Sequence, residues 1–452
     1  MTVGDFFSLT RPSLFLVSGG HRWSVEEYLE RAARVAAQLG ASAAPVINLC
    51  EQRAAFLVAY MAALLSARTT LLPSSRAAEA VAAVAAEYPG SVVVDDALVA
   101  AATADRGSEL SAAPLATEVN ADFVAMIGFT SGSTGVPTRH AKRWGTVAAS
   151  TVHNAAALRA AIPPELSGKQ PWVVGTVPSQ HMYGMELTVL LPLLDGMGIH
   201  AGRPLLPEEV AAALAEVPEP RVLVSTPAHL RAIVASGVVL PKTAVVACAT
   251  APLDAELAAQ VEAATGGILV EMFGSTETCI LAHRRTAQER WWTPYTGVEL
   301  HPESEHTRVS APWFLQDERL LDLVERDDRG RFSLLGRSAD LVDVAGKRAS
   351  LGDLNQRLLR IPGVVDGVIF QPQQSRGLVR RLAAMVVAPG LTTEQLREAL
   401  APAMDPVFLP RPLLLVPSLP RTAAGKLPRA TLEEALADLL SAGAAKRGVA
   451  DV

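Results

Sequence analysis

The stretch "GFTSGSTGVPTRHAKRW", Gly128–Trp144, decides how the rest of this 452-residue chain is interpreted. It continues an apolar, strand-like run, "DFVAMIGF", and then contains only threonine, serine and glycine over six positions. These six positions are Thr130, Ser131, Gly132, Ser133, Thr134 and Gly135. A loop of this kind is usually a surface turn. Its glycines also allow close approach of the backbone to a ligand, and its hydroxyl groups add donors, so the alternative is a cradle for phosphate groups.

Composition excludes several classes of protein. The net charge of −6 and the pI near 5.9 argue against a general nucleic-acid binder. No apolar run reaches the length of a membrane span, and the N-terminus lacks a basic segment followed by an apolar core. The three cysteines are far apart, which argues against a disulfide framework or a CxxC zinc site. We therefore expect a cytoplasmic protein with no membrane insertion and no nucleic-acid partner.

The order of elements predicts an α/β fold. A helix is expected from Ser24, with Glu27 completing a capping box, and short apolar strands then alternate with amphipathic helices. This pattern indicates largely parallel α/β layers, whose ligands lie beyond the carboxyl ends of the strands. After about residue 290 short antiparallel strands are expected as a small β-barrel-like portion, with a hairpin turning at Asp328–Gly330. We place the domain boundary between 1–337 and a small C-terminal α+β domain, 338–452.

Familiar catalytic motifs are absent. The chain has no HExxH, no GxSxG and no GxxxxGK[ST], so it supports neither a zinc protease, an α/β-hydrolase nor a P-loop NTPase. "GMGIHA" at Gly196 resembles a dinucleotide loop, but "GRPLLP" follows it instead of a helix.

Three further stretches place polar groups where strands or hairpins end. They are "MFGSTETC" (Met272–Cys279) after a strand-like run, a hairpin bracketed by Asp322 and Arg337, and "LPRTAAGKLPR", which contains Lys426. Taken singly, they are an ordinary loop, a solvated ion pair and an exposed lysine. A carboxylate next to a phosphate site is favourable if Mg²⁺ lies between the two anions.

In this order and at these separations, the four stretches resemble the adenylate-forming superfamily. That superfamily includes acyl-CoA synthetases, aryl-CoA ligases, the adenylation domains of nonribosomal peptide synthetases, and luciferases. The resemblance runs from Ser24 to about Leu439 and implies the fold of these adenylating enzymes, with a mobile C-terminal domain. It makes "TSGSTGVP" the phosphate loop, "FGSTE" the adenine and magnesium motif, and the segment with Lys426 the catalytic lysine loop. ATP and Mg²⁺ are the implied cofactors.

The resemblance also implies roles for single residues. Phe273 resembles the ring stacked on adenine, Thr276 the contact to the α-phosphate, and Glu277 the magnesium ligand. Asp322 resembles the ribose-binding carboxylate, with Arg337 beside it, and Lys426 bridges the substrate carboxylate and the α-phosphate. His181 in "PSQHMYG" resembles the gating residue of the acid pocket, although a structural histidine is the alternative. The other positions implied for the acid pocket are Met182, Ala249, Thr250, Ala251 and Gly274.

Some positions depart from the superfamily pattern. Thr138 and Arg139 follow Pro137 where lysine and glycine are usual, so either Lys142 or Arg139 replaces the phosphate-loop cation. Leucines stand where Thr-Gly usually precedes the ribose aspartate. The hinge residue falls within Ser338–Asp340.

The resemblance further implies the substrate and the acceptor. Met182 stands where members that activate amino acids carry an aspartate, which disfavours an amino acid. The compact "HMYGMELTVLLPLLDGMGIHAG" segment looks most like the stand-alone ligases of aryl polyene and xanthomonadin pigment clusters. We therefore expect an AMP-forming acid–thiol ligase that activates 3- or 4-hydroxybenzoate and passes it to the pantetheine thiol of an acyl carrier protein. The alternatives are an aryl- or medium-chain acyl-CoA synthetase that uses free CoA, and a catalytically inactive adenylate-fold binding protein.

Overall fold

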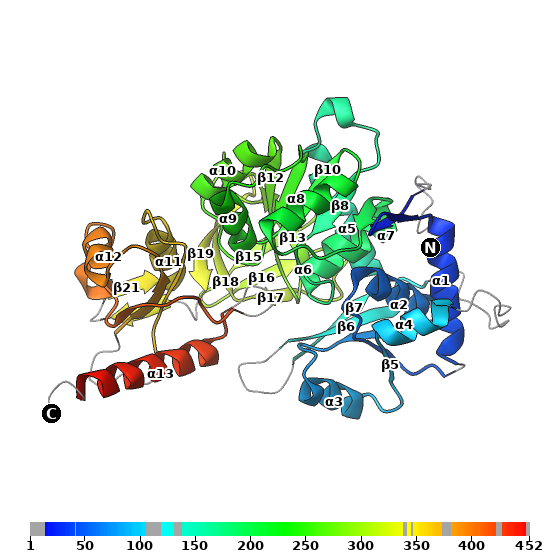
Figure 1. The fold of residues 1–452 in the computed structure, drawn as a ribbon, viewed down its shortest axis with the longest axis horizontal. Coiled ribbons are helices and arrows are strands. Elements are labelled where there is room, and N and C mark those ends of the chain that lie inside the picture. Colours follow the sequence, from blue (N-terminus) through cyan, green and yellow to red (C-terminus); the bar gives the residue numbers. More distant parts are fainter. Residues whose placement is uncertain are drawn as a thin grey trace. The chain divides into compact units, whose positions relative to one another are not determined.

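The computed structural model divides this chain into two compact units, each described here by itself (Figure 1). The first comprises residues 1–249, 255–299 and 310–318, and the second comprises residues 250–254, 300–309 and 319–452. Within them the structure describes residues 14–40, 42–104, 119–130, 138–337, 341–344, 347–372, 381–421 and 427–448. The expected boundary after residue 337 stays a prediction.

A five-stranded sheet in the first unit carries the strand that leads into the Thr-Ser-Gly loop. Its order is β5 (Val92–Val94), β3 (Val46–Asn48), β4 (Thr70–Leu72), β6 (Val124–Thr130) and β7 (Thr138–Arg143). The strands are parallel except for β7, which returns antiparallel to β6. Thr130 pairs with Thr138, so the two ends of the loop leave and re-enter this sheet side by side.

Four helices accompany this sheet. They are α1 (Val25–Gln38), α2 (Arg53–Leu65), α3 (Ala78–Glu87) and α4 (Asp96–Ala104). The expected start of α1 is confirmed, because the Ser24 side chain accepts a hydrogen bond from the Glu27 amide at 3.1 Å. Helix α2 is buried at nearly every position, which matches its uniformly apolar sequence.

A nine-stranded sheet forms the rest of the first unit's framework. Its order is β14 (Thr293–Pro294), β13 (Cys279–Arg284), β12 (Ile268–Ser275), β11 (Val245–Cys248), β10 (Arg221–Ser225), β8 (Trp172–Gly175), β9 (Gly198–His200), β1 (Leu16–Ser18) and β2 (His21–Trp23). The central strands from β12 to β1 are parallel, and antiparallel strands close both edges. The expected α/β fold with parallel layers is therefore confirmed.

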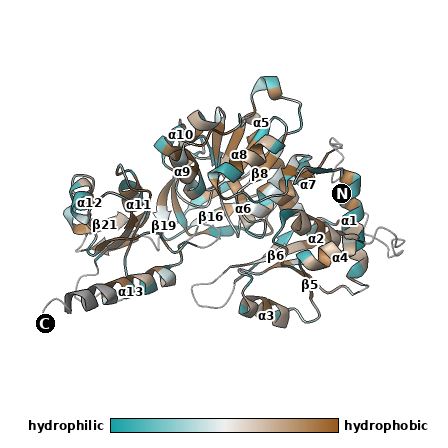
Figure 2. Cartoon of the chain, viewed as in Figure 1, coloured by the Kyte–Doolittle hydropathy of each residue, from teal (hydrophilic) through white to brown (hydrophobic). Residues whose placement is uncertain are grey.

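Helical segments connect these strands. They are α5 (Trp144–Ala160), the 3₁₀ helix η2 (Pro164–Leu166), α6 (Met182–Met185), the π-helix η3 (Glu186–Leu190), α7 (Leu191–Asp195), α8 (Pro207–Glu216), α9 (Pro227–Ser236) and α10 (Ala255–Thr265). Figure 2 shows the hydrophobic colour along the central strands of this sheet. This is expected where helices cover a parallel sheet.

Short strands follow, as expected. A three-stranded sheet contains β15 (Glu299–Pro302), β16 (Thr307–Ser310) and β17 (Glu318–Leu320), and β18 (Asp322–Arg326) pairs antiparallel with β19 (Phe332–Arg337). The hairpin predicted around Asp328–Gly330 is present, with Gly330 at a φ of +78°. In the part of the chain that the structure describes, these strands form two separate sheets and no closed barrel.

The C-terminal part has the expected α+β character. Its elements are β20 (Leu341–Val344), β21 (Lys347–Ser350), α11 (Leu351–Leu359), β22 (Asp366–Phe370), β23 (Ala383–Val387), α12 (Thr393–Leu400), the 3₁₀ helix η5 (Pro406–Phe408), β24 (Leu413–Leu415) and α13 (Arg429–Gly448). Alternate residues of β23 enter different cores: Ala384 and Val386 join one with α11 and α12, and Ala383 and Met385 join one with α13. Both faces of this small sheet are thus covered. Among the described helices, none is both long and apolar enough to cross a bilayer.

Candidate active site

Three of the predicted stretches converge at Gly128 on β6. A Cβ atom built on this buried glycine would lie 3.9 Å from the Cγ2 of Thr276 and 4.0 Å from the Cε of Met182. The strand before the Thr-Ser-Gly loop, the "FGSTE" motif and the segment Gln180–Met182, here called the "QHM" segment, therefore meet at one place in the first unit. The loop residues Ser131, Gly132, Ser133, Thr134 and Gly135 lie outside the described residues, and of Thr130 only the backbone is described.

The structure separates the two cations expected to replace the phosphate-loop lysine. The Lys142 side chain is buried, with 4% of the residue exposed, and its Nζ donates to the backbone carbonyl of Glu277. Arg139 lies on β7 with a largely exposed side chain and pairs with Glu87 of α3 at 2.7 Å. Lys142 is thus the cation that contacts the predicted magnesium residue.

The turn Ser275–Cys279 joins β12 to β13 and presents Thr276 and Glu277. Two hydrogen bonds at Thr278 hold the turn: the Ser275 amide donates to Thr278 Oγ1 at 3.0 Å, and the Thr278 hydroxyl donates to the Cys279 carbonyl at 2.8 Å. A Cβ on Gly274 would lie 2.1 Å from the carbonyl oxygen of Cys279, so only glycine fits there. Cys279 itself has a φ of +61°, which is costly for a side-chain-bearing residue.

The Glu277 carboxyl is partly exposed and held ionised. Its Oε1 lies 3.7 Å from His140 Nε2. Partial burial acts to raise the pKa of Glu277, but a hydrogen bond from Ser275, one from its own backbone amide, and the nearby His140 and Lys142 lower it on balance. Burial lowers the pKa of His140, and the Glu277 carboxylate opposes that effect.

Glu277 and its surroundings fit a magnesium site that has few protein ligands. The Glu277 carboxylate offers a hard oxygen ligand, and among the described residues no three His, Cys, Asp or Glu side chains gather as a metal cage. Mg²⁺ is usually held by one or two carboxylates together with waters and substrate phosphates. Such a site therefore needs no complete set of protein ligands.

Sequence reasoning missed His140 and Glu318. His140 lies two residues before Lys142 on β7, so both side chains point to the same face, a period-two signal visible in the sequence. Burial raises the pKa of Glu318, and Lys142 and Glu277 act on it in opposite directions. No sequence signal predicts that Glu318, forty-one residues after Glu277, would return beside it.

The expected adenine-binding ring lies at the end of β12. Phe273 is partly buried, and its ring lies 5.3 Å from that of Trp292 in a tilted arrangement. The Arg284 guanidinium covers the Trp292 ring at 4.3 Å. Phe273 is therefore supported by a second aromatic residue that sequence reasoning did not identify.

The "QHM" segment is held by a close backbone approach. His181 precedes α6 at its N-cap position, and Met182 begins the helix. A Cβ on Gly184 would lie 2.0 Å from the carbonyl oxygen of Pro178, so the chain turns back on itself at this point. The buried guanidinium of Arg53 braces the preceding strand end by donating to the carbonyls of Gly175 and Val177 at 3.0 and 2.8 Å.

The remaining predicted residues belong to other segments. Ala249 is buried directly after β11, Thr250 adopts a φ of +83°, and Ala251 follows it. In the second unit, Asp322 and Arg337 are Cα partners across the β18–β19 hairpin, as their bracketing positions predicted. Lys426 and the hinge residues 338–340 lie outside the described residues.

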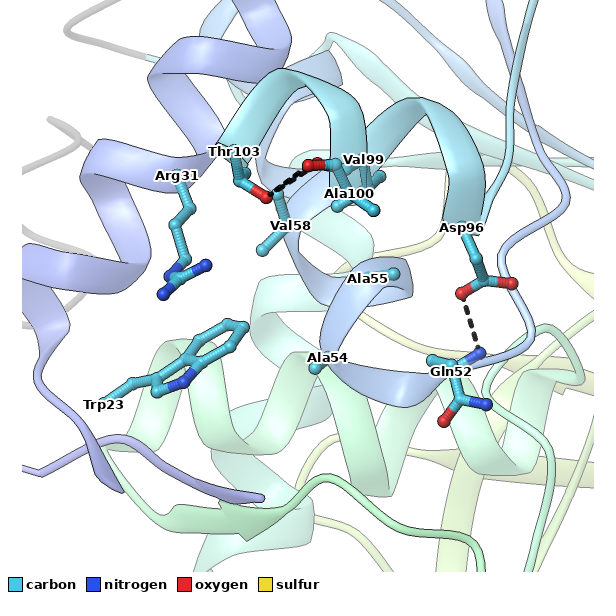
Figure 3. A pocket seen from close by; sticks show the side chains of 10 residues that line it. All are labelled: Trp23, Arg31, Gln52, Ala54, Ala55, Val58, Asp96, Val99, Ala100 and Thr103. Atoms are coloured by element: carbon cyan, nitrogen blue, oxygen red, sulfur yellow. Dashed lines mark hydrogen bonds between the residues drawn. The ribbon is translucent and has the colours of Figure 1, made fainter. Parts of the chain in front are cut away.

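A separate cavity of about 290 Å³ lies among α1, α2 and α4 (Figure 3). At one end the Arg31 guanidinium lies over the ring of Trp23 at 4.2 Å. At the other end the Asp96 carboxylate accepts a hydrogen bond from the backbone amide of Gln52 at 3.0 Å. None of its lining residues is a predicted site residue. It is therefore distinct from the convergence at Gly128.

The chain resembles curated proteins over part of its length. It is 28% identical to 4-coumarate–CoA ligase of Cereibacter sphaeroides over 309 residues, which covers 66% of this chain and 69% of that protein. It is 33% identical to enterobactin synthase component F of Escherichia coli O157:H7 over 158 residues, or 30% of this chain. That match spans only 12% of the enterobactin protein.

Solved structures share the whole fold. The o-succinylbenzoate CoA synthetase of Bacillus subtilis, in complex with its acyl-adenylate, superposes with a TM-score of 0.80 at 17% identity, covering 95% of this chain and 97% of that one. The same enzyme has been solved with ATP and a magnesium ion. ATP-bound MatB of Rhodopseudomonas palustris gives a TM-score of 0.76 at 20% identity, covering 97% and 100% of the two chains.

A family model described as "AMP-binding enzyme" matches residues 9–306, which is more than half of the chain. The match includes the Thr-Ser-Gly loop, the "QHM" segment and the Ser275–Cys279 turn. The chain belongs to the AMP-binding enzyme family.

Proposed function

We propose that this protein is an AMP-forming acid–thiol ligase that uses ATP and Mg²⁺. The observation that carries the proposal is the convergence of Gly128, Thr276 and Met182, because it joins the phosphate-loop strand, the magnesium motif and the acid-pocket segment. Such an arrangement would bring a nucleotide triphosphate and a carboxylic acid next to each other. Membership of the AMP-binding family supports the nucleotide half of this reaction.

The first half-reaction needs positioning more than proton transfer. The substrate carboxyl, with a pKa near 4, is already ionised at neutral pH, so no general base is required. One of its oxygens attacks the α-phosphorus of ATP, and the bond from that phosphorus to the bridging oxygen breaks, releasing pyrophosphate. The barrier comes from bringing two anions together and from charge on the leaving group.

The chain's own groups are suited to lower that barrier. Glu277 would hold Mg²⁺, which when bound supplies positive charge for the phosphate oxygens. Thr276 would contact the α-phosphate, and the loop 130–135 would receive the pyrophosphate end. Lys142 fixes the backbone of Glu277, and Lys426 would neutralise the two reacting anions.

Nucleotide selection and acid selection fall to different segments. We assign adenine stacking to Phe273 and ribose binding to Asp322, with Arg337 beside it. We assign the acid pocket to His181, Met182, Gly274 and the segment Ala249–Ala251. In the second half-reaction the thiol sulfur attacks the acyl carbon and AMP leaves, a step for which the C-terminal domain would rotate about Ser338–Asp340.

We further propose that the acid is a 3- or 4-hydroxybenzoate and that the acceptor is the pantetheine thiol of an acyl carrier protein. The apolar Met182 in place of a carboxylate supports an aryl acid that carries no ammonium group. The second candidate is a synthetase that uses free CoA, which the similarity to 4-coumarate–CoA ligase favours.

The buried free cysteines Cys50, Cys248 and Cys279 are compatible with a reducing cytoplasm.

The test is ATP–pyrophosphate exchange across a panel of hydroxybenzoates, cinnamates and medium-chain fatty acids. We expect exchange with hydroxybenzoates, and a loss of about 100-fold or more in Lys426→Ala, because a charge at the reacting centre is removed. Lys169→Ala, at an exposed lysine, is the matched control and should retain full exchange. Unchanged exchange in Lys426→Ala would show that the catalytic assignment is wrong.

A second measurement separates the acceptors. Mass spectrometry of a holo carrier protein and of CoA, each incubated with enzyme, ATP and the accepted acid, reports which thiol becomes acylated. Acylated carrier protein supports the first candidate, and acyl-CoA alone supports the second.

A further inference from the structure

Glu186 is a buried carboxylate with no role in the proposed chemistry. It interrupts an otherwise apolar run, "MELTVLLPLL", and only 1% of the residue is exposed. It begins the π-helix η3, Glu186–Leu190, directly after α6. Buried ionisable groups are costly unless they are well bonded, and π-helical turns are frequent at functional sites. Both features indicate that Glu186 has a specific purpose.

The partners of Glu186 come from two distant segments. From α5, Ser150 Oγ donates at 2.8 Å and Asn154 Nδ2 at 3.2 Å. From β13, the backbone amide of Ile280 donates to both carboxylate oxygens at 3.1 Å. Burial raises the pKa of Glu186, and the donors together with Lys142 oppose that effect. The carboxylate therefore accepts hydrogen bonds from both α5 and β13.

The hydrogen bonds from Ile280 place the Glu186 carboxylate at the base of the Ser275–Cys279 turn. Ile280 follows Cys279, whose positive φ requires outside contacts to be maintained. The Ser150 Oγ also lies 3.4 Å from the Ile280 carbonyl oxygen, and the Tyr295 hydroxyl donates to Asn154 Oδ1 at 2.7 Å. The C-terminal end of the turn is thus held by a network of hydrogen bonds, and Glu186 is the acceptor common to Ser150, Asn154 and Ile280.

The same residue is continuous with the acid-pocket segment. Helix α6 starts at Met182 and runs without a break into η3, so Glu186 lies about one helical turn beyond Met182, whose side chain faces Gly128. The Glu186 side chain therefore connects the turn at Ile280 to the helix that carries Met182.

We propose that Glu186 is a positioning residue that holds the Ser275–Cys279 turn, and with it Thr276 and Glu277, in register with the acid-pocket segment. This inference rests on the proposed function, since the turn is taken to bind the α-phosphate and Mg²⁺. Glu186 touches no substrate itself. It acts through Ile280 on one side and through α6 on the other.

The test compares three variants of the full chain. Glu186→Leu removes every acceptor, and Glu186→Gln keeps the size and one acceptor oxygen for Ile280. Thr188→Val is the matched control, because it removes one buried bond of the same segment, from Thr188 Oγ1 to the Gly184 carbonyl at 2.7 Å, without reaching the turn. Thermal unfolding, AMP binding by calorimetry and pyrophosphate exchange are measured for each.

We expect kcat/KM for ATP to fall about 100-fold in Glu186→Leu and about 10-fold in Glu186→Gln, since small misplacements of reacting groups have effects of this size. AMP binding should weaken in the same order, and Thr188→Val should stay within about 2-fold of the wild type. A further variant adds Glu186→Gln to the double variant Thr276→Val, Glu277→Gln. There, Glu186→Gln should lower kcat/KM for ATP by less than about 3-fold more, because the effects of residues that act through one unit are not additive.

The outcomes distinguish the two proposals. Wild-type protein that binds AMP and exchanges pyrophosphate, while Glu186→Gln behaves like Thr188→Val, overturns the role of Glu186 alone. Full additivity in the doubly substituted background also overturns it, because it indicates a general structural role. Wild-type protein with neither activity overturns the proposed function and this inference with it. If Glu186→Leu fails to fold, Glu186→Gln and the additivity measurement decide.

Discussion

The Ser275–Cys279 turn and the β18–β19 hairpin both present predicted nucleotide-binding residues, but they are built differently. The turn depends on residues far away in sequence: Lys142, 135 positions from Glu277, and Glu186, 94 positions from Ile280. The hairpin turn is closed by Asp327, which accepts bonds from Arg329 and Arg331 within four positions. One region is therefore assembled by the tertiary fold, and the other by its own local sequence.

This difference predicts where substitutions are tolerated. In the turn, distant changes should alter catalysis, because they move the backbone that carries Thr276 and Glu277. In the hairpin, changes at the turn should alter local stability only. Asp322 should keep its position, because strand pairing places it opposite Arg337. The following predictions test this contrast, from the largest expected effect to the smallest.

Replacing Glu277 with glutamine should have the largest effect on the turn. We expect kcat/KM for ATP to fall about 100-fold or more, because the charge that would hold Mg²⁺ is lost. The dependence of pyrophosphate exchange on Mg²⁺ concentration should shift upward, and the thermal midpoint should change little because the carboxyl is partly exposed. An unaltered Mg²⁺ dependence would exclude Glu277 as the ligand.

Replacing Asp322 with alanine tests the hairpin's contribution. The loss of hydrogen bonds from the ribose hydroxyls to a charged group predicts a rise in KM for ATP of about 10- to 100-fold. The wild type should discriminate against 2′- or 3′-deoxy-ATP, and the variant should not. The backbone should persist, because Thr307 donates to the Asp322 carbonyl and not to its side chain. Discrimination retained by the variant would contradict the ribose role.

Lys142→Met and Arg139→Gln form a matched pair on one strand. The buried Lys142 contacts the Glu277 backbone, so its loss should lower kcat/KM for ATP about 10-fold, a typical effect for a residue that supports a metal ligand. Arg139 makes an exposed ion pair with Glu87, and its loss should change kcat/KM less than about 2-fold. Equal effects of the two variants would remove the distinction between them.

The smallest effect is expected at the hairpin turn, from Asp327→Asn. Partial burial acts to raise the pKa of Asp327, but hydrogen bonds from the Arg331 side chain and from the Arg331 and Arg329 amides lower it on balance. A lowered folded-state pKa stabilises the protein above the unfolded value of about 3.9, and this contribution is lost as the pH falls through the folded value. The difference in thermal midpoint between wild type and variant should therefore be constant near neutrality and shrink in acid, with exchange activity unchanged. A pH-independent difference would contradict the assignment.

The same contrast explains what the sequence could predict. The α/β class, the helix capped by Ser24 and the hairpin near Gly330 follow from local patterns of apolar residues, capping groups and turn residues. The choice between Lys142 and Arg139 could not be made, because it depends on which face of β7 meets the Ser275–Cys279 turn. Glu186 and Glu318 were invisible for the same reason, since each meets its partners only through packing between distant strands and helices.

The close approach at Gly184 bears on how such an enzyme could change its substrate. Because the backbone itself blocks any larger residue there, the course of the chain from Pro178 to Gly184 is settled before an acid arrives. The proposed function assigns the acid pocket to His181 and Met182, which lie on this fixed stretch of backbone. On that proposal, a library restricted to these two side chains should alter the preference for the acid with little loss of folded protein.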